Sequence, residues 1–241
     1  DDHFDAAEGY RGRNQFLIAF QDTILQPRPG TGSTASDPQG FEIDGCATGS
    51  ASNCPSQSAT PFNVPVFANF TIVGGGTQTQ ASSGGIGMVL RRGTGGFWVN
   101  GIVARWGRQG LSIRDSTTNN RRLADSLQVR NVLFVDNGVT LDPGAGNFTQ
   151  PSNVIGWGID SVATATASFF AGVPALGTAP TAAGLDFSIA AGSPAATSGL
   201  ATFSGALQAR AGAFVVPTAY RGAAAPAGPR WWQGWTNYAR N

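Results

Sequence analysis

Short apolar runs, separated by glycines and charged residues, recur through the amino-terminal part of the chain. Runs of this kind, rich in Val, Ile, Leu and Phe and bounded by turn residues, are typical of β-strands. Glycines lie at many of the boundaries, where their tolerance of positive φ angles allows a sharp corner. The pattern predicts strands over residues 15–20, 66–73, 88–92, 97–104, 111–114 and 127–135.

Asparagine recurs at a fixed interval within these runs. Asn69, Asn100 and Asn131 are spaced 31 residues apart, and each lies inside an apolar segment. A fixed period of roughly 20–50 residues is typical of a solenoid, in which successive coils stack on one another. In such a stack a side-chain amide can hydrogen-bond the backbone at a corner and pair with the asparagine above it. The spacing therefore predicts a β-solenoid with an asparagine ladder.

The chain divides into a repeating part and an irregular part. Residues 1–160 carry the predicted coils, interrupted by a polar insertion over residues 22–65. Cys46 and Cys54 lie inside that insertion, and a close cysteine pair in such a loop indicates a disulfide clip. A disulfide in turn favours an oxidising compartment, so we expect a secreted or surface protein. Residues 161–241 are rich in Ala, Gly, Pro, Thr and Ser and are expected to be irregular.

The irregular part ends in an aromatic tail, RWWQGWTNYARN. Trp231, Trp232, Trp235 and Tyr238 would be a costly surface to leave in water. We expect this tail to fold back as a cap on the solenoid. A second hypothesis is that the four aromatic side chains contact carbohydrate or another subunit. Before the tail, the sequence predicts a short helix over residues 163–170 and short strands over residues 185–189 and 213–216.

The composition of the 241 residues excludes several function classes. All 15 basic residues are Arg, which excludes Schiff-base chemistry and a lysine general base. The net charge is only +1 and the arginines are spread along the chain, which argues against nucleic acid or anionic lipid as a partner. No apolar run approaches the roughly 18 residues of a membrane span.

The repeat with an asparagine at each corner resembles the right-handed parallel β-helix proteins of the pectate-lyase-like group. More narrowly, a family of secreted bacterial β-helix proteins of unassigned function is similar to the stretches DDHFDAAEGYRGRNQFLIAFQ, SDPQGFEIDG, FANFTIVG, LRRGTGGFWVNGI and AYRGAAAPAGPRWWQGWTNYA. The resemblance spans nearly the whole chain. It implies an all-β, right-handed parallel β-helix and a correspondence to the carboxyl-terminal portion of longer members. It implies no established activity.

A second, local resemblance concerns the spacing Asp-Asp-x-x-Asp at Asp1, Asp2 and Asp5. It is similar to the calcium-binding motif of one class of polysaccharide lyases, and three carboxylates would supply the oxygen ligands that Ca²⁺ prefers. In those lyases calcium grips a uronate carboxylate while a Lys, or in other pectate lyases an Arg, removes the α-proton. In this chain the candidate bases are Arg91, Arg92, Arg105 and Arg114.

Two smaller groups are also candidates for chemistry. The segment SDPQGFEIDGC places Asp37, Glu42 and Asp44 close together, most simply as a solvated turn cluster. His3, the sole histidine, could act with Asp5 or Glu8, although a lone histidine is more often a structural residue.

These observations favour three hypotheses for function. The leading one is a non-catalytic extracellular structural protein that self-associates end to end, because no capping element precedes the first coil and the surface charge is low. The second is a calcium-dependent polysaccharide lyase. The third is a carbohydrate-binding or adhesion module that uses Trp98, Trp106 or the tail tryptophans for stacking. The expected partners are copies of the chain itself or a polysaccharide, and calcium is the candidate cofactor.

Overall fold

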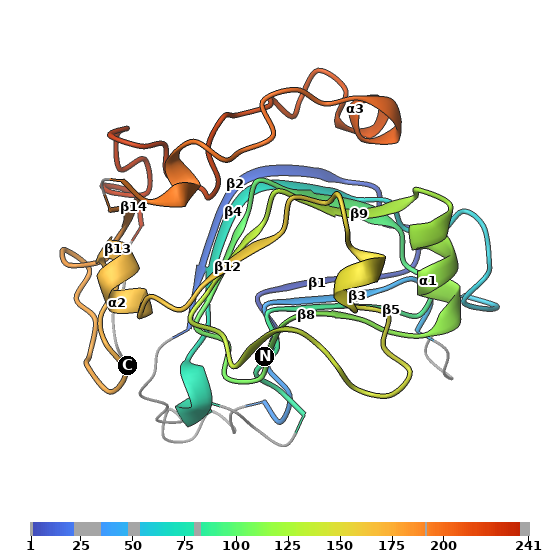
Figure 1. The fold of residues 1–241 in the computed structure, drawn as a ribbon, viewed down its shortest axis with the longest axis horizontal. Helices are drawn as coiled ribbons and strands as arrows, with labels where there is room; N and C mark the ends of the chain where they lie inside the picture. Colours follow the sequence, from blue (N-terminus) through green and yellow to red (C-terminus); the bar gives the residue numbers. More distant parts are fainter. Residues whose placement is uncertain (1, 22–34, 48–53, 80–82, 191, 237–241) are drawn as a thin grey trace.

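The strands stack as the rungs of a parallel β-helix (Figure 1). The computed structural model describes residues 2–21, 35–47, 54–79, 83–190 and 192–236. All strand pairs within the two larger sheets are parallel, and strands of successive rungs lie in register. The all-β solenoid predicted from the sequence is therefore confirmed.

One face of the β-helix is a five-stranded sheet, here called sheet A. Its strands lie in the order β1, β3, β5, β8 and β11, so each rung contributes one strand. Their bounds are Phe4–Ala6, Phe41–Asp44, Met88–Arg91, Gln109–Ile113 and Val139–Leu141. Phe4 lies opposite Phe41, and Phe41 lies opposite Met88, so the inward side chains form a continuous column.

The other strands of the solenoid form a bent sheet of seven strands, here called sheet B. Its order is β12, β10, β7, β4, β6 and β9, with β2 paired to β4. Their bounds are β2 Arg13–Phe20, β4 Val66–Val73, β6 Gly96–Val99, β7 Ile102–Ala104, β9 Leu127–Arg130, β10 Leu133–Val135 and β12 Asp160–Val162. The chain turns at Asn100 and Asn131, so the single strands predicted over 97–104 and 127–135 are each two strands that meet at a corner.

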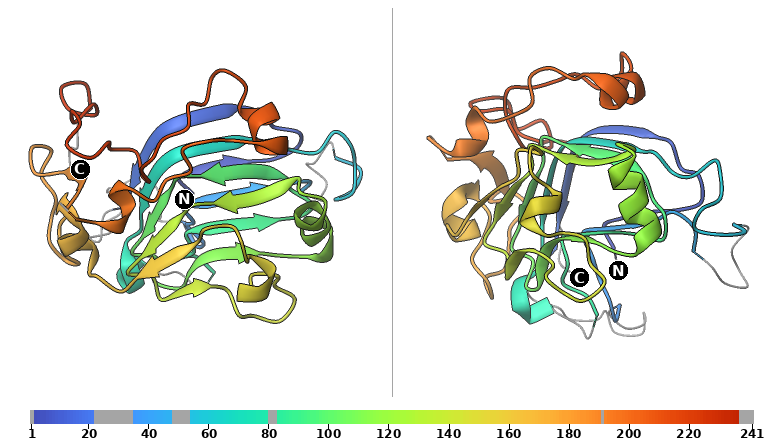
Figure 2. Two further views of the ribbon diagram at one scale, coloured as in Figure 1. Left: turned by 45° about the horizontal axis from the view of Figure 1, so that its top comes forward. Right: turned by 45° about the vertical axis from the view of Figure 1, so that its right-hand side comes forward.

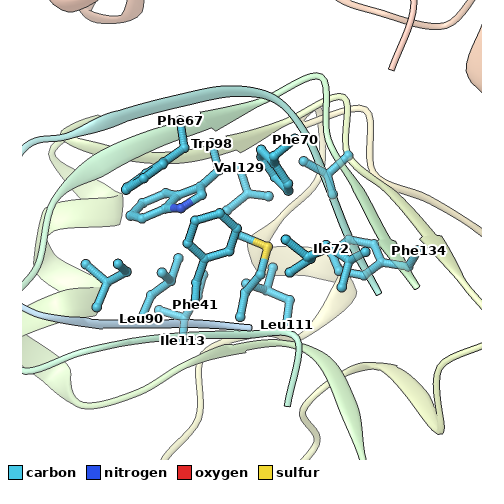
Figure 3. Packing of buried hydrophobic residues seen from close by; sticks show 14 of the residues in the cluster. Phe41, Phe67, Phe70, Ile72, Leu90, Trp98, Leu111, Ile113, Val129 and Phe134 are labelled. Carbon is cyan, nitrogen blue, oxygen red and sulfur yellow. The ribbon is translucent and has the colours of Figure 1, made fainter. Parts of the chain in front are cut away.

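Aromatic and aliphatic side chains fill the interior of the β-helix (Figure 3). Phe41 packs edge-on against Phe67 and Phe70, with ring centroids 5.0 and 5.1 Å apart, and Phe67 stacks on Trp98 at 6.0 Å. Burying rings of this size is the main source of stability in such a core. Trp98 is fully buried and Trp106 is 1% exposed, so the hypothesis that either one is a carbohydrate platform is wrong.

A strand and a helix occupy stretches in which the sequence indicated only loops. Strand β3 lies within residues 22–65, so part of that expected insertion is a rung of sheet A. Helix α1 (Ser116–Leu123) connects sheet A to sheet B, and the Asp115 carboxylate caps it by accepting a backbone hydrogen bond. The disulfide between Cys46 and Cys54 is present, as predicted.

After β12 the chain packs against the outside of sheet B (Figure 2). Helix α2 and the antiparallel pair β13–β14 cover one half of the sheet, and helix α3 covers the other. The bounds are α2 Thr166–Phe169, β13 Phe170–Gly172, β14 Asp186–Ile189 and α3 Gly205–Ala211, with 3-10 turns at Gly76–Thr79, Pro151–Asn153 and Pro194–Ala196. This segment lies along the side of the solenoid.

The local predictions for this segment have mixed outcomes. The helix expected near residues 163–170 and the strand near 185–189 are confirmed as α2 and β14. Residues 213–216 form no strand. Within the described ranges, no helix combines the length and the apolar character needed to cross a lipid bilayer.

Candidate functional site

Ionisable side chains lie along the outer face of sheet A. In β3, Phe41 and Ile43 point into the core, and the alternation of a strand therefore turns Glu42 and Asp44 outward. Arg91 of β5 lies in register with Asp44 of β3. Parallel stacking thus places the carboxylates of one rung beside the guanidinium of the next.

Arg91 is the centre of an ion-pair network on this face. Its guanidinium contacts Glu42 and lies 2.7 Å from Asp44 Oδ1. Arg92, at the corner that follows, also pairs with Asp44. The Arg91 side chain is 22% exposed and that of Asp44 is 8% exposed, so the network is largely withdrawn from water but still reachable at Arg91.

The next rung repeats the arginine. The register of β5 and β8 places Arg114 beside Arg91. Arg114 Nε donates a hydrogen bond to Ser112 Oγ at 2.9 Å, and Ser112 Oγ donates to Asp142 Oδ2 at 2.7 Å. The guanidinium of Arg114 is 3.8 Å from Asp142, and its side chain is 34% exposed. Two arginines of adjacent rungs therefore lie side by side on one face.

The electrostatics of this face reflect its partial burial. Burial lowers the pKa of Arg91, and the charges of Arg92 and Arg114 lower it further. Burial also lowers the pKa of Arg114, while Asp142 opposes that effect. Burial raises the pKa of Asp44, against the influence of Arg92. Bringing these charged groups together on a partly buried face therefore carries a desolvation penalty for each of them.

Two of the three predicted calcium ligands, Asp2 and Asp5, lie among the described residues. Asp1 lies outside the described residues. Asp2 Oδ1 accepts a hydrogen bond from Gln39 N at 2.7 Å, and burial raises the pKa of Asp2 with help from the neighbouring Asp5 and Asp37. Among the residues with described positions, no group of three or more His, Cys, Asp or Glu could hold a metal ion. Calcium binding through Asp1, Asp2 and Asp5 stays a prediction.

The three asparagines stack at the bend of sheet B. Asn69, Asn100 and Asn131 have φ angles of 49°, 57° and 51°, a left-handed conformation that asparagine tolerates better than most residues. Phe16 occupies the equivalent place in the first rung, with a φ of 60°. The fixed spacing in the sequence therefore marks the corner of each coil.

The amides of this column bind a segment of the chain that the sequence did not connect with them. Residues 198–223, here called the strap, run across the column. Asn131 Nδ2 donates to Ser198 O at 2.9 Å, and Asn69 Nδ2 donates to Thr218 Oγ1 at 2.8 Å. The prediction that the asparagines pair with one another is therefore wrong for the described hydrogen bonds, because the strap takes up their amides.

The tail tryptophans lie close to one another. Trp231, Trp232 and Trp235 surround a pocket beside Phe20 of the first rung. The fourth residue of that prediction, Tyr238, lies outside the described residues.

His3 takes a structural position. Its ring packs edge-on against Trp106, with centroids 5.6 Å apart. Burial is the main cause that lowers the pKa of His3 to about 4, so the imidazole is neutral at physiological pH. These contacts give no support to the hypothesis that His3 acts with Asp5 or Glu8.

Sequence reasoning missed the link between the acidic segment and the arginines. Glu42 and Asp44 were expected to be turn residues, and the glycine and proline around them hid a short strand. A signal was nevertheless present. FEID and LSIRD both place polar residues at every second position, which is the period of a strand with one buried face.

A family model described as a pectate-lyase like beta helix domain matches residues 1–167. The matched range contains all strands of sheets A and B. No curated protein and no solved structure matches the chain.

Proposed function

Since the chain belongs to the pectate-lyase-like β-helix family, we propose that it binds an acidic polysaccharide along the outer face of sheet A. The observation that carries the proposal is the pair Arg91 and Arg114 on adjacent rungs. Like charges on neighbouring strands destabilise a sheet, and a bound carboxylate would offset that repulsion. Adjacent rungs are about 4.8 Å apart, a spacing of the order of one sugar residue. A polymer with one carboxylate per sugar therefore suits Arg91 and Arg114, here called the arginine row.

The roles of the side chains follow from their geometry. Arg114 is the more exposed of the two arginines and is only loosely paired with Asp142, at 3.8 Å, so it is the main contact for a ligand carboxylate. A guanidinium can hold a carboxylate through two parallel hydrogen bonds. Asp2 and Asp5 lie at the first rung, and their carboxylates would supply oxygen ligands if calcium takes part in binding.

Binding, rather than cleavage, is the function favoured by these contacts. A β-eliminating lyase needs a base for the proton next to the uronate carboxylate, and Arg91 has a lowered pKa. However, Arg91 is paired with Glu42 and Asp44, and these carboxylates stabilise its charged form. Incubation with polygalacturonate and calcium, monitored by ultraviolet absorbance of unsaturated product, distinguishes the two outcomes. We expect binding without product.

The experiment that tests the proposal compares two forms of one polymer. Polygalacturonate and its fully methyl-esterified form share a backbone and differ in charge. We expect the acid form to bind and the ester to bind at least tenfold more weakly, with affinity for the acid falling as salt is raised. Equal affinity for both forms would show that the arginine row does not recognise the carboxylates of the polymer. The disulfide between Cys46 and Cys54 supports the further proposal that this binding takes place outside the cell.

End-to-end association is a second candidate, and one observation at the first rung favours it. Phe16 occupies the column that holds asparagine in the next three rungs, and it is 40% exposed. A rung of a second copy stacked on β2 would cover this ring. Sedimentation of the wild type and Phe16→Ser at increasing concentration tests the idea. Concentration-dependent assembly that Phe16→Ser abolishes supports it, and a monomer at all concentrations rejects it.

A further inference from the structure

The pocket surrounded by Trp231, Trp232 and Trp235 lies between the first rung and the segment that follows the β-helix. Its volume is about 450 Å³, within the range of roughly 300–1,000 Å³ typical of small-ligand sites. It is lined by residues of β2, of β14 and the stretch that leads into it, and of the tail: Ile18, Phe20, Ala182, Ala183, Leu185, Phe187, Trp231, Trp232, Gln233, Gly234, Trp235 and Thr236.

The aromatic rings of the pocket form one continuous wall. Phe20 packs edge-on against Phe187 at 6.1 Å, and Phe187 packs edge-on against Trp232 at 5.8 Å. Trp231 lies edge-on to Trp232 at 5.7 Å and parallel to Trp235 at 6.1 Å, with an interplanar angle of 22°. Trp235 is 70% exposed, so the wall ends in a large ring that is open to solvent.

Each indole N–H of the wall is already bonded to the backbone. Trp231 Nε1 donates to Ala223 O at 2.9 Å, and Trp232 Nε1 donates to Leu185 O at 3.4 Å. Trp235 Nε1 donates to Trp231 O at 2.5 Å. These bonds fix the rings in place and leave their carbon faces as the surface that a ligand would meet.

Among the residues that the structure describes, those lining the pocket carry no charged side chain. Arg230 and Asp186, which neighbour lining residues in the sequence, pair with each other at 2.5 Å, and the Arg105 guanidinium lies over the Phe20 ring, 5.7 Å from its centroid. The polar side chains of the lining are Gln233 and Thr236, close in sequence to the exposed ring of Trp235. An acidic sugar therefore meets no counter-charge from the described lining residues, which distinguishes this pocket chemically from the arginine row of sheet A.

We propose that this pocket binds a neutral sugar residue, whose apolar C–H face stacks on Trp235 while its hydroxyls reach Gln233 and Thr236. A sugar ring matches a site with a flat aromatic surface and a few polar groups at its edge. The site lies outside the β-helix domain matched by the family model, apart from the β2 residues Ile18 and Phe20. It is independent of the acidic ligand proposed for sheet A.

The test is a depletion assay in which the full chain is mixed with insoluble cellulose, xylan or mannan and the unbound protein is measured. Three proteins are compared: the wild type, Trp235→Ala, and the control Phe214→Ala, which removes another exposed ring (63% exposed) from the strap. We expect the wild type and the control to bind at least one neutral polysaccharide and Trp235→Ala to bind it about tenfold more weakly.

Two results would overturn this proposal. One is that none of the neutral polysaccharides depletes the wild type, and the other is that Trp235→Ala binds as well as the control. Polygalacturonate binding by Trp235→Ala is measured in parallel. If it equals that of the wild type while cellulose, xylan or mannan binding is lost, the two sites are separate, and failure of one proposal leaves the other standing.

Discussion

Asn100 and Leu200 form a two-point hydrogen-bonded pair between a side-chain amide and a backbone. Leu200 N donates to Asn100 Oδ1 at 2.6 Å, and Asn100 Nδ2 donates to Leu200 O at 3.3 Å. Gln15 forms the same kind of pair with Val216, with distances of 2.7 and 3.0 Å. The amide groups at the bend of sheet B thus bind the strap much as a neighbouring strand would.

Asn100 both adopts the left-handed φ of the corner and binds the strap through its amide, and two substitutions separate these roles. Asn100→Gly keeps the left-handed φ and loses the amide, so we expect the free energy of unfolding to fall by about 1–3 kcal/mol. Asn100→Ala also strains the backbone, so we expect about 1 kcal/mol more. Urea denaturation measures both. Asn120→Ala, on the exposed side of α1, is the control and should lie within about 0.5 kcal/mol of the wild type. Equal urea midpoints for Asn100→Gly, Asn100→Ala and Asn120→Ala would show that the Asn100 amide does not stabilise the fold.

The strap depends on its apolar contacts as well as on the amides. Leu207 of α3 is 2% exposed and packs with Val66 and Val99 on the outside of sheet B. We expect Leu207→Ala to destabilise this region by about 2–4 kcal/mol and to expose the strap to proteolysis between residues 198 and 223. Leu123→Ala, at a position 67% exposed, is the control. Identical cleavage rates for the two variants would show that the strap is held by the amides alone.

His3 makes stability depend on pH in a defined direction. Its pKa is lowered to about 4 by burial, against 6.5 for the ordinary group, so the folded state disfavours the charged imidazole. The unfolded chain takes up a proton below pH 6.5 and the folded chain does not. The contribution of His3 to stability is therefore present above pH 6.5 and declines as the pH falls towards 4.

The variant His3→Phe keeps a ring against Trp106 and cannot titrate. We expect the stability difference between the wild type and His3→Phe to change between pH 6.5 and 4 and to be constant above that window. Urea denaturation at intervals of half a pH unit measures it. The raised pKa of Asp2 and Asp44 acts in the opposite direction, but it is common to both proteins and cancels in the difference. A stability difference between the two proteins that is independent of pH would show that the His3 imidazole is exposed to solvent in the folded state.

The disulfide closes a short loop, with a sequence separation of 8 between Cys46 and Cys54. The chain-entropy relation gives a stabilisation of about 2.5 kcal/mol for a loop of this length. We expect the double variant Cys46→Ser, Cys54→Ser to lose about that amount in urea denaturation. Addition of a reductant should shift the wild type to the same midpoint and leave the variant unchanged. A wild type insensitive to reductant while the disulfide is demonstrably open would contradict the estimate.

Much of the fold could be predicted from the sequence because the strands are apolar and their corners recur. Residues 66–73 form β4 as expected, since every one of them is buried. The interval between asparagines also matches the number of residues from one corner of the solenoid to the corner stacked on it. What the sequence could not reveal is that strands end at Asn100 and Asn131, whereas β4 continues through Asn69. All three asparagines have a left-handed φ, which the neighbouring apolar residues conceal.

The candidate sites were harder to predict because they join distant segments. Glu42 and Arg91 are 49 residues apart and meet only through the register of β3 and β5. Likewise, Asn100 and Leu200 are separated by 100 residues, and the strap has the composition of a linker. Trp98 was a candidate surface platform because nothing in its local pattern distinguishes the two faces of the strand.

Binding of an acidic polysaccharide to the arginines of sheet A is tested most directly by isothermal titration calorimetry. Polygalacturonate binding is compared for the wild type, Arg114→Gln and Arg11→Gln. Both variants remove one positive charge, but Arg11 is an exposed residue that precedes β2, away from sheet A. We expect Arg114→Gln to lose about tenfold or more in affinity and Arg11→Gln to bind like the wild type. Equal losses in the two variants, or no loss in either, would contradict the proposed binding.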